Sequence, residues 1–140
     1  MRDAFNNINP IRCISPVVIG DDTPSVGATI DRQGFDSLTY VISTGTLADI
    51  DATFAILLEE SDDSGMSGAT AVADSDLLGT ETLAGFTFTH DDETRKLGYI
   101  GDKRFTRLTL TPSGNSGSAP VSVVAVLAWP SVAATANPPT

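Results

Sequence analysis

Hydrophobic and polar side chains alternate most clearly in the segment LTYVIST, residues 38–44. Leu38, Tyr40 and Ile42 fall on one face of an extended chain, while the residues between them fall on the other. This period of two predicts a β-strand with one buried face. The segment ATFAILLEES, residues 52–61, repeats the pattern, with its larger apolar side chains at Phe54, Ile56 and Leu58.

Further strands are predicted over GFTFT (85–89), KLGYIG (96–101), RFTRLTLT (104–111) and VSVVAVLAW (121–129). Residues 61–70 (SDDSGMSGAT) are typical of a solvated loop. Residues 71–82 fit a short strand or a helical turn equally well. The segment 121–129 is apolar on both faces, so it is either a central strand covered on both sides or a strand whose outer face another subunit buries.

These elements divide the chain into an extended N-terminal arm (1–36) with one or two short strands, a β-sandwich domain (37–130) and a C-terminal tail (131–140) rich in small residues and proline. About seven or eight strands separated by turns predict an all-β, two-sheet antiparallel sandwich. We expect the jelly-roll topology, with extended arms at both ends.

Composition agrees with a single β-rich domain. The 140 residues are 41% hydrophobic and only 19% charged, which is enough apolar side chain for one core. The single cysteine, Cys13, cannot form an internal disulfide, so the fold does not depend on an oxidising compartment. Because no signal-like or membrane-spanning apolar run is present, we expect no membrane partner and assembly in a cytoplasm.

The formal net charge of −10 disfavours direct binding of nucleic acid. Charge is also segregated, because the interval between Arg32 and Arg95 holds thirteen acidic residues and no Lys or Arg. Such segregation suits head-to-tail contacts between copies or docking on a basic partner. A solvated acidic face that serves only solubility is the alternative.

No residue pattern indicates catalysis. The only histidine, His90, is followed by Asp91 and Asp92 in a turn, but no nucleophile elbow accompanies it. The acidic turn EESDDSG, residues 59–65, offers oxygen ligands for calcium, but it lacks the spacing of a known calcium loop. A zinc site would have only one His and one Cys as ligands. We therefore predict no enzymatic activity, no metal site and no cofactor.

Five of the eight basic residues cluster between positions 95 and 107. They could bind a phosphate or a sugar acid, but no glycine-rich loop leads into a helix as phosphate binders require. A subunit contact is the favoured interpretation, since arginine is enriched in interfaces. The apolar run of the N-terminal arm is a second contact element. The expected interface residues are therefore Arg95, Lys96, Asp102, Lys103, Arg104, Arg107, Pro16, Val17 and Val18.

Two segments, LLEESDDSG (57–65) and GYIGDKRFTRLTLTP (98–112), together with a last strand that ends in Trp129 and Pro130, resemble small virion proteins of tailed bacteriophages. The resemblance covers about residues 38–130. It implies a structural head decoration or cement protein, located in the virion and assembled in the host cytoplasm. Its partners would be the major capsid protein and copies of itself, with a trimer expected.

Two alternatives stay open. The first is a structural component of the tail, neck or fibre base. The second comes from a remoter resemblance to discoidin-type jelly rolls, which implies a carbohydrate-binding module, although this chain lacks obvious aromatic-rich loop tips.

Overall fold

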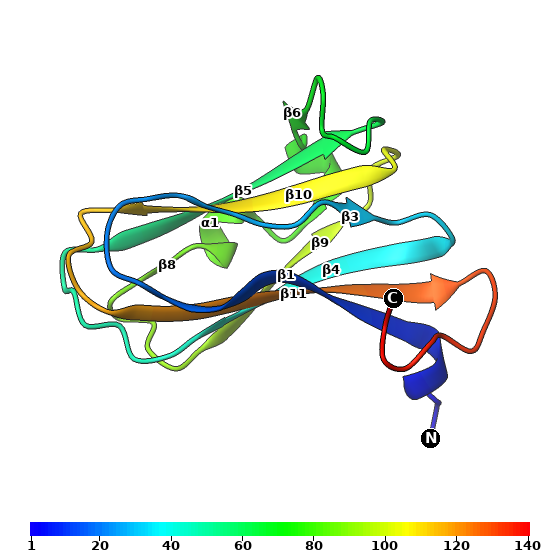
Figure 1. The fold of residues 1–140 in the computed structure, drawn as a ribbon, viewed down its shortest axis with the longest axis horizontal. Coiled ribbons are helices and arrows are strands. Elements are labelled where there is room, and N and C mark those ends of the chain that lie inside the picture. The colour runs from blue at the N-terminus through cyan, green and yellow to red at the C-terminus, as the bar shows by residue number, and fades with distance from the viewer.

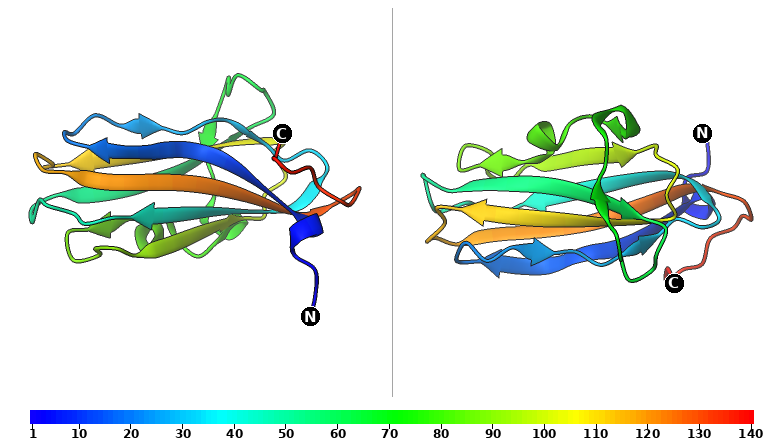
Figure 2. Two further views of the ribbon diagram at one scale, coloured as in Figure 1. Left: turned by 60° about the horizontal axis from the view of Figure 1, so that its bottom comes forward. Right: turned by 90° about the horizontal axis from the view of Figure 1, so that it is seen from above.

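The computed structural model describes all 140 residues. Their strands form two antiparallel sheets that pack face to face (Figures 1 and 2). The first sheet has the order β1-β11-β4-β9-β7, and the second β2-β10-β5-β6, in which β3 also pairs with β10 and β8 with β5. The strands are β1 (Ile8–Ile19), β2 (Ser25–Val26), β3 (Ile30–Asp31), β4 (Phe35–Thr44), β5 (Thr53–Ser61), β6 (Thr70–Ala71), β7 (Leu77–Leu78), β8 (Phe86–Thr87), β9 (Thr94–Tyr99), β10 (Phe105–Ser113) and β11 (Ala119–Pro130). The helical pieces are the α-helix α1 (Glu81–Ala84) and the 3-10 helices η1 (Phe5–Asn7) and η2 (Asp74–Asp76).

The strand order is that of a jelly roll. We count β2 with β3 as one interrupted strand and β6 with β8 as another, and leave out the short edge strand β7. The eight remaining strands, numbered in chain order, lie 1-8-3-6 in the first sheet and 2-7-4-5 in the second. This interleaving is the double Greek key of an eight-stranded jelly roll. The predicted all-β sandwich is therefore confirmed.

The alternating segments form the strands that were predicted from them. Leu38, Tyr40 and Ile42 point into the core from β4 and are at most 2% exposed, and β5 contributes Phe54 and Leu58 in the same way. The core joins 25 buried residues from both sheets into one cluster. Burial of this apolar surface is the main stabilising term for such a domain.

Strand β11 lies between β1 and β4 in the first sheet. Val121, Val123 and Leu127 face the core and are buried, whereas Val124 and Val126 point away from the core and remain partly exposed. Packing within the subunit therefore accounts for the apolar residues on the inner face of β11, but not for those on its outer face.

The expected boundary at residue 37 does not hold, because Ile8–Ile19 is a strand of the sandwich and not part of an arm. Strand β1 pairs with β11 over its length and buries Cys13, Ile14 and Ile19. Two register shifts, between Arg12 and Ile14 and between Ile14 and Val17, interrupt its side-chain alternation. These irregularities hide the period of two from the sequence, and an edge strand tolerates the prolines that also obscured it.

The last ten residues contain no strand or helix and fold back beside the N-terminal segment, as Figure 1 shows. The Thr135 amide donates to the carbonyl oxygen of Asn6, and its hydroxyl donates to that of Ile8.

Residues 71–82, for which two structures were possible, contain the end of β6, η2, β7 and the start of α1. Thr80 caps α1 by accepting a hydrogen bond from the Leu83 amide. None of the helices has the length and apolar character needed to cross a membrane.

Candidate interaction surface

Four of the five clustered basic residues pair with an acidic residue of the same chain. The ion pairs are Arg95 with Glu93 (2.8 Å), Lys103 with Asp62 (2.8 Å), Arg104 with Asp31 (2.7 Å) and Arg107 with Glu59 (2.9 Å). These arginines and Lys103 therefore meet their acidic neighbours within the subunit.

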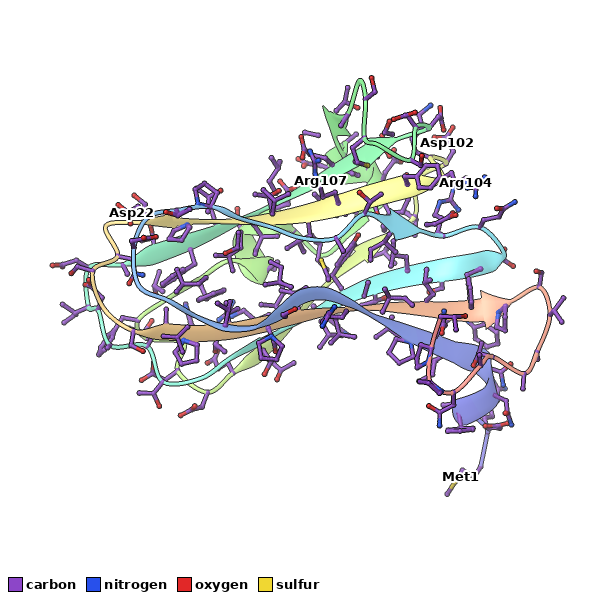
Figure 3. The ribbon with its side chains drawn as sticks, viewed as in Figure 1. Met1, Asp22, Asp102, Arg104 and Arg107 are labelled. Carbon is purple, nitrogen blue, oxygen red and sulfur yellow. The ribbon has the colours of Figure 1, made fainter.

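Arg104 and Lys103 lie at the end of the sandwich where β9 turns into β10, and Figure 3 shows Arg104 and Asp102 at this end. Arg104 binds both carboxylate oxygens of Asp31 through Nε and one terminal nitrogen. This hydrogen bonding lowers the pKa of Asp31, and the bond from Lys103 lowers the pKa of Asp62. Asp102, one of the expected interface residues, forms no ion pair or side-chain hydrogen bond.

Tyr99 organises the turn that carries these bases. Its hydroxyl donates to a Glu60 carboxylate oxygen (2.6 Å) and accepts from the Lys103 amide (3.0 Å). Burial, followed by the bond to Glu60, raises the pKa of Tyr99. Gly101 is required here, because a Cβ at this position would lie 2.5 Å from the Tyr99 hydroxyl oxygen. Contacts within the subunit therefore hold the turn between Tyr99 and Lys103 in place.

Arg107 and Glu59 face each other across β10 and β5, where they are register partners. Their side chains are 28% and 22% exposed, so the pair is partly withdrawn from water. Arg95, on β9, donates to the Leu83 carbonyl oxygen in α1 as well as to Glu93. Arg95 therefore ties α1 to the first sheet and is not placed beside Lys103 or Arg104.

Lys96 is the exception in the cluster, because it is exposed and has no acidic partner. Strand pairing places it in a row that crosses four strands of the first sheet: Arg12, Val124, Val41 and Lys96. Arg12 is exposed and also unpaired. The adjacent outward row continues the apolar surface and contains Pro10, Val126, Thr39, Gly98 and Leu78.

The two outward rows of the first sheet carry no carboxylate. Strands β1, β7, β9 and β11 contain no Asp or Glu at all. The one acidic residue of β4, Asp36, is exposed near the start of that strand and belongs to neither of the two rows. In a chain with 18 acidic residues, this surface is distinctive. We call it the acid-free face, defined by the two rows above.

A shallow apolar groove continues the acid-free face along β1, β4 and β11. It has a volume of about 450 Å³, and Pro16, Val17, Val18, Pro120 and Val121 line its apolar part. Val17 is 43% exposed and Val18 61% exposed. The three expected interface residues of the N-terminal segment thus line one groove, which neither Lys103 nor Arg104 lines.

A surface rich in carboxylates lies at one end of the sandwich, where the connections 20–24, 45–52 and 88–93 come together. Asp22 marks this end in Figure 3, far from Arg104. The three connections hold seven acidic residues and no Lys or Arg: Asp21, Asp22, Asp49, Asp51, Asp91, Asp92 and Glu93. We call this the acidic end.

Backbone amides fix several carboxylates of the acidic end. Asp49 accepts from the amides of Asp51 and Ser116, which lowers its pKa, and Asp91 accepts from the Leu47 amide (2.7 Å). Ile50, between Asp49 and Asp51, is 72% exposed. The acidic end therefore presents an apolar side chain with a carboxylate on each side in the sequence.

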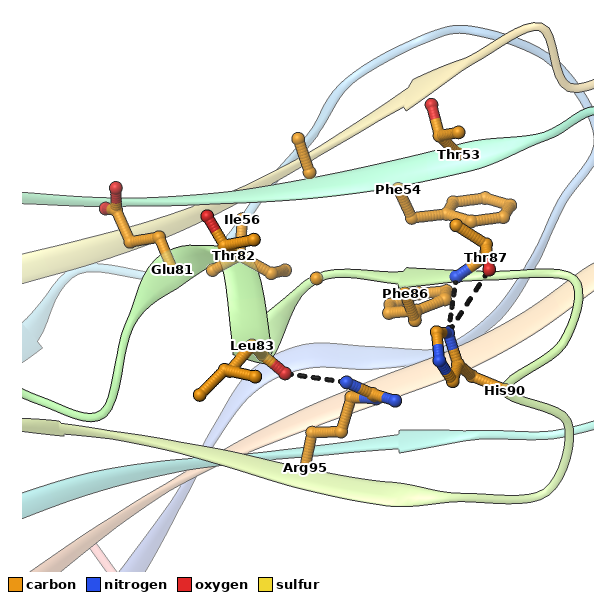
Figure 4. A pocket seen from close by; sticks show the side chains of 12 residues that line it. Thr53, Phe54, Ile56, Glu81, Thr82, Leu83, Phe86, Thr87, His90 and Arg95 are labelled. Atoms are coloured by element: carbon orange, nitrogen blue, oxygen red, sulfur yellow. Dashed lines mark hydrogen bonds between the residues drawn. The ribbon is translucent and has the colours of Figure 1, made fainter.

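A surface hollow of about 520 Å³ lies between α1, β5, β8 and the start of β9, and Figure 4 shows its lining. His90 accepts a hydrogen bond at Nδ1 from the Thr87 amide (3.0 Å). The neighbouring Asp91 carboxylate binds the Leu47 amide, so it does not orient the imidazole. No Ser or Cys lines the hollow, and both terminal nitrogens of Arg95 are already bonded.

The candidate metal ligands of the turn 59–65 bind the protein itself. The Asp63 carboxylate accepts from the Gly65 and Ser67 amides, while Glu59, Glu60 and Asp62 bond to Arg107, Tyr99 and Lys103. No group of three His, Cys, Asp or Glu side chains is placed to hold a metal ion.

Arg12, Val41 and the role of Ile50 were not anticipated from the sequence. Their importance depends on strand register and on the meeting of distant loops, which leave no local pattern. No family model matches this chain, and no curated protein sequence matches it either.

Proposed function

We propose that this protein is a structural subunit of a tailed-bacteriophage particle, and that it decorates and reinforces the head shell. The observation that carries the proposal is the acid-free face, an apolar surface flanked by unpaired Arg12 and Lys96 in a chain of net charge −10. A surface of this kind is suited to burial against another protein. Reinforcement would come from the area buried across subunit boundaries of the shell.

Two further features support the proposal. The jelly roll is a scaffold that viral capsid proteins use repeatedly, although fold alone does not decide function. The polar clusters are engaged in internal pairs, as the bonds of Arg104, Arg107 and Asp63 illustrate. The proposed function therefore depends on contact surfaces and not on reaction chemistry.

The test is to purify the particles of the phage or prophage that encodes the chain and to measure copy number by quantitative mass spectrometry. A decoration protein is expected at a stoichiometry on the order of hundreds of copies, and a neck or tail ring at about six or twelve. Absence from purified particles would overturn the virion proposal. A copy number of about six or twelve would keep the virion role but move the protein from the head to the tail or neck.

Attachment is tested with particles that lack the protein. Added wild-type protein is expected to bind them, and the Arg12→Glu/Lys96→Glu variant is expected to bind less. The Arg2→Glu variant serves as a control for added negative charge, because Arg2 lies outside the acid-free face. Equal binding by all three proteins would show that the acid-free face is not used for attachment.

A further inference from the structure

We propose that copies of this protein bind one another head to tail, with the acidic end of one copy on the acid-free face of the next. The inference deepens the proposed function, on which it rests for its biological use, by naming a neighbouring copy on the shell as the occupant of that face, so that contacts between copies strengthen attachment. The contact itself is a property of the isolated protein.

The chemistry of the two surfaces is complementary. On the acid-free face, Val124 and Val41 lie between Arg12 and Lys96, in one row fixed by strand register. At the acidic end, the exposed Ile50 lies between Asp49 and Asp51 in the sequence. An apolar centre with flanking positive charge thus faces an apolar centre with flanking negative charge. Such matching favours both encounter and orientation.

A symmetric contact between two acid-free faces is disfavoured. Such a dimer would bring two copies of Arg12 and Lys96 together, and the strand residues of that face supply no carboxylate to neutralise them. Juxtaposed like charges oppose association. Contact between two acidic ends would likewise bring fourteen carboxylates together without a base, seven from each copy. The heterologous contact is the arrangement that satisfies both surfaces.

The size of the acid-free face is adequate for a protein contact. Four strands about 4.8 Å apart, taken over the 6 residues of β9 at about 3.3 Å each, give a plan area of roughly 400 Å². Side-chain relief and the adjoining groove add to it, which brings the surface toward the roughly 800 Å² that each partner buries in a standard interface. Because the contact is heterologous, it repeats from copy to copy and closes a ring if the rotation allows it.

The carboxylates on the acidic side are held ready for the contact. Asp49 is fixed by the amides of Asp51 and Ser116, so little side-chain ordering remains for association. Asp51 accepts no hydrogen bond through its carboxylate and is free to meet a cation. Neither Arg12 nor Lys96 has an internal partner to release.

The experiment measures the mass of the purified wild-type chain by sedimentation equilibrium, over a range of concentrations at low and high salt. We expect association that weakens by roughly tenfold or more at high salt, because the contact joins opposite charges. A protein that stays monomeric at every concentration and salt overturns the inference. If that monomer is nevertheless incorporated into particles, the proposed function stands and only the head-to-tail contact is refuted. If the protein forms oligomers but is absent from particles, only the proposed function is refuted.

Two variants assign the surfaces. The first, Arg12→Glu/Lys96→Glu, alters the acid-free face, and the second, Ile50→Ala/Asp51→Lys, alters the acidic end. Each alone is expected to lose self-association. Mixed together they are expected to form a complex, because the intact face of the second variant can still bind the intact acidic end of the first. A symmetric contact would not show this complementation, so failure of the mixture to associate overturns the head-to-tail arrangement.

A matched control is available at the other end of the sandwich. Ile100 is 57% exposed and Asp102 has no side-chain partner, so Ile100→Ala/Asp102→Lys makes the same chemical changes away from the acidic end. This variant should associate like the wild type, and loss of association by it would contradict the proposal. Thermal unfolding checks that each variant is folded. If the charge-reversed face variant is not, Arg12→Gln/Lys96→Gln tests the same surface.

Discussion

The hydroxyl groups of Tyr40 and Thr106 form a 2.7 Å hydrogen bond across the core, joining β4 of the first sheet to β10 of the second. Both residues are 0% exposed. Burial raises the pKa of Tyr40, so the phenol is neutral and can donate or accept. The two sheets are thus held in one lateral position by a specific polar contact as well as by apolar packing.

Removing one partner of this bond leaves the other buried without a partner. We expect Tyr40→Phe and Thr106→Val each to lower the free energy of unfolding by about 1–3 kcal/mol. The double variant should lose less than the sum of the two, because it leaves no orphaned hydroxyl. Urea unfolding of all four proteins measures the coupling. Additive losses would show that the bond does not contribute to stability.

Arg107 and Lys96 should respond differently to truncation. Arg107→Ala removes the partly buried pair with Glu59 and the packing of the side-chain stem, so we expect a loss of about 1 kcal/mol in unfolding free energy. Lys96→Ala removes an exposed side chain without a partner and should leave stability nearly unchanged. Chemical denaturation compares the two. Equal losses would contradict the structural role assigned to Arg107.

Stability should fall in acid through the carboxylates that are hydrogen-bonded in the native state. Asp31 and Asp62 have pKa values lowered from 3.8, chiefly by bonds from Arg104 and Lys103. A lowered native pKa means that the unfolded chain binds protons first, so this stabilisation is complete above the unfolded pKa. It is lost as the pH falls below about 4 and through the native pKa.

The Asp31→Asn variant isolates one of these groups. Its melting temperature should decline less steeply than that of the wild type between pH 5 and about pH 2.5, since one proton-linked group has been removed. The two proteins are compared by thermal unfolding followed by circular dichroism. Parallel pH profiles would show that the Asp31 pair contributes no pH-dependent stability.

Cys13 should be unreactive in the folded protein. Burial raises the pKa of its thiol to about 12, and the residue is only 6% exposed. Because the thiolate is the reactive form, a thiol-specific reagent should modify Cys13 at neutral pH only when the chain unfolds. Rapid stoichiometric labelling of the native protein would contradict the burial of β1 against the core.

The close approach between β1 and β10 should make Gly27 intolerant of a side chain. A Cβ at this position would lie 2.5 Å from Cys13 Sγ and 2.7 Å from the Leu108 carbonyl oxygen. We expect Gly27→Ala to destabilise the fold by about 1–3 kcal/mol. Gly20→Ala is the control, since a Cβ there meets no atom within 4 Å. The midpoint of urea unfolding distinguishes them.

Local pattern was sufficient for most of the fold. Alternation around Tyr40 and Ile56 predicted strands and their buried faces, because the period of two is a property of the extended backbone itself. Strand β1 escaped prediction for the converse reason. Its register shifts between Arg12 and Val17 break that period, and the pairing with β11 that stabilises it is more than a hundred residues away in the chain.

The candidate surface was less accessible from sequence. Charge counts correctly placed acidic and basic residues in separate intervals, but they could not show that Arg104 meets Asp31 and Arg107 meets Glu59 inside one subunit. Local patterns along the chain therefore specify the sandwich, its core faces and its surplus of negative charge. Which charges remain unpaired depends on the folded chain, because strand register and loop convergence bring together residues that have no relation along the sequence.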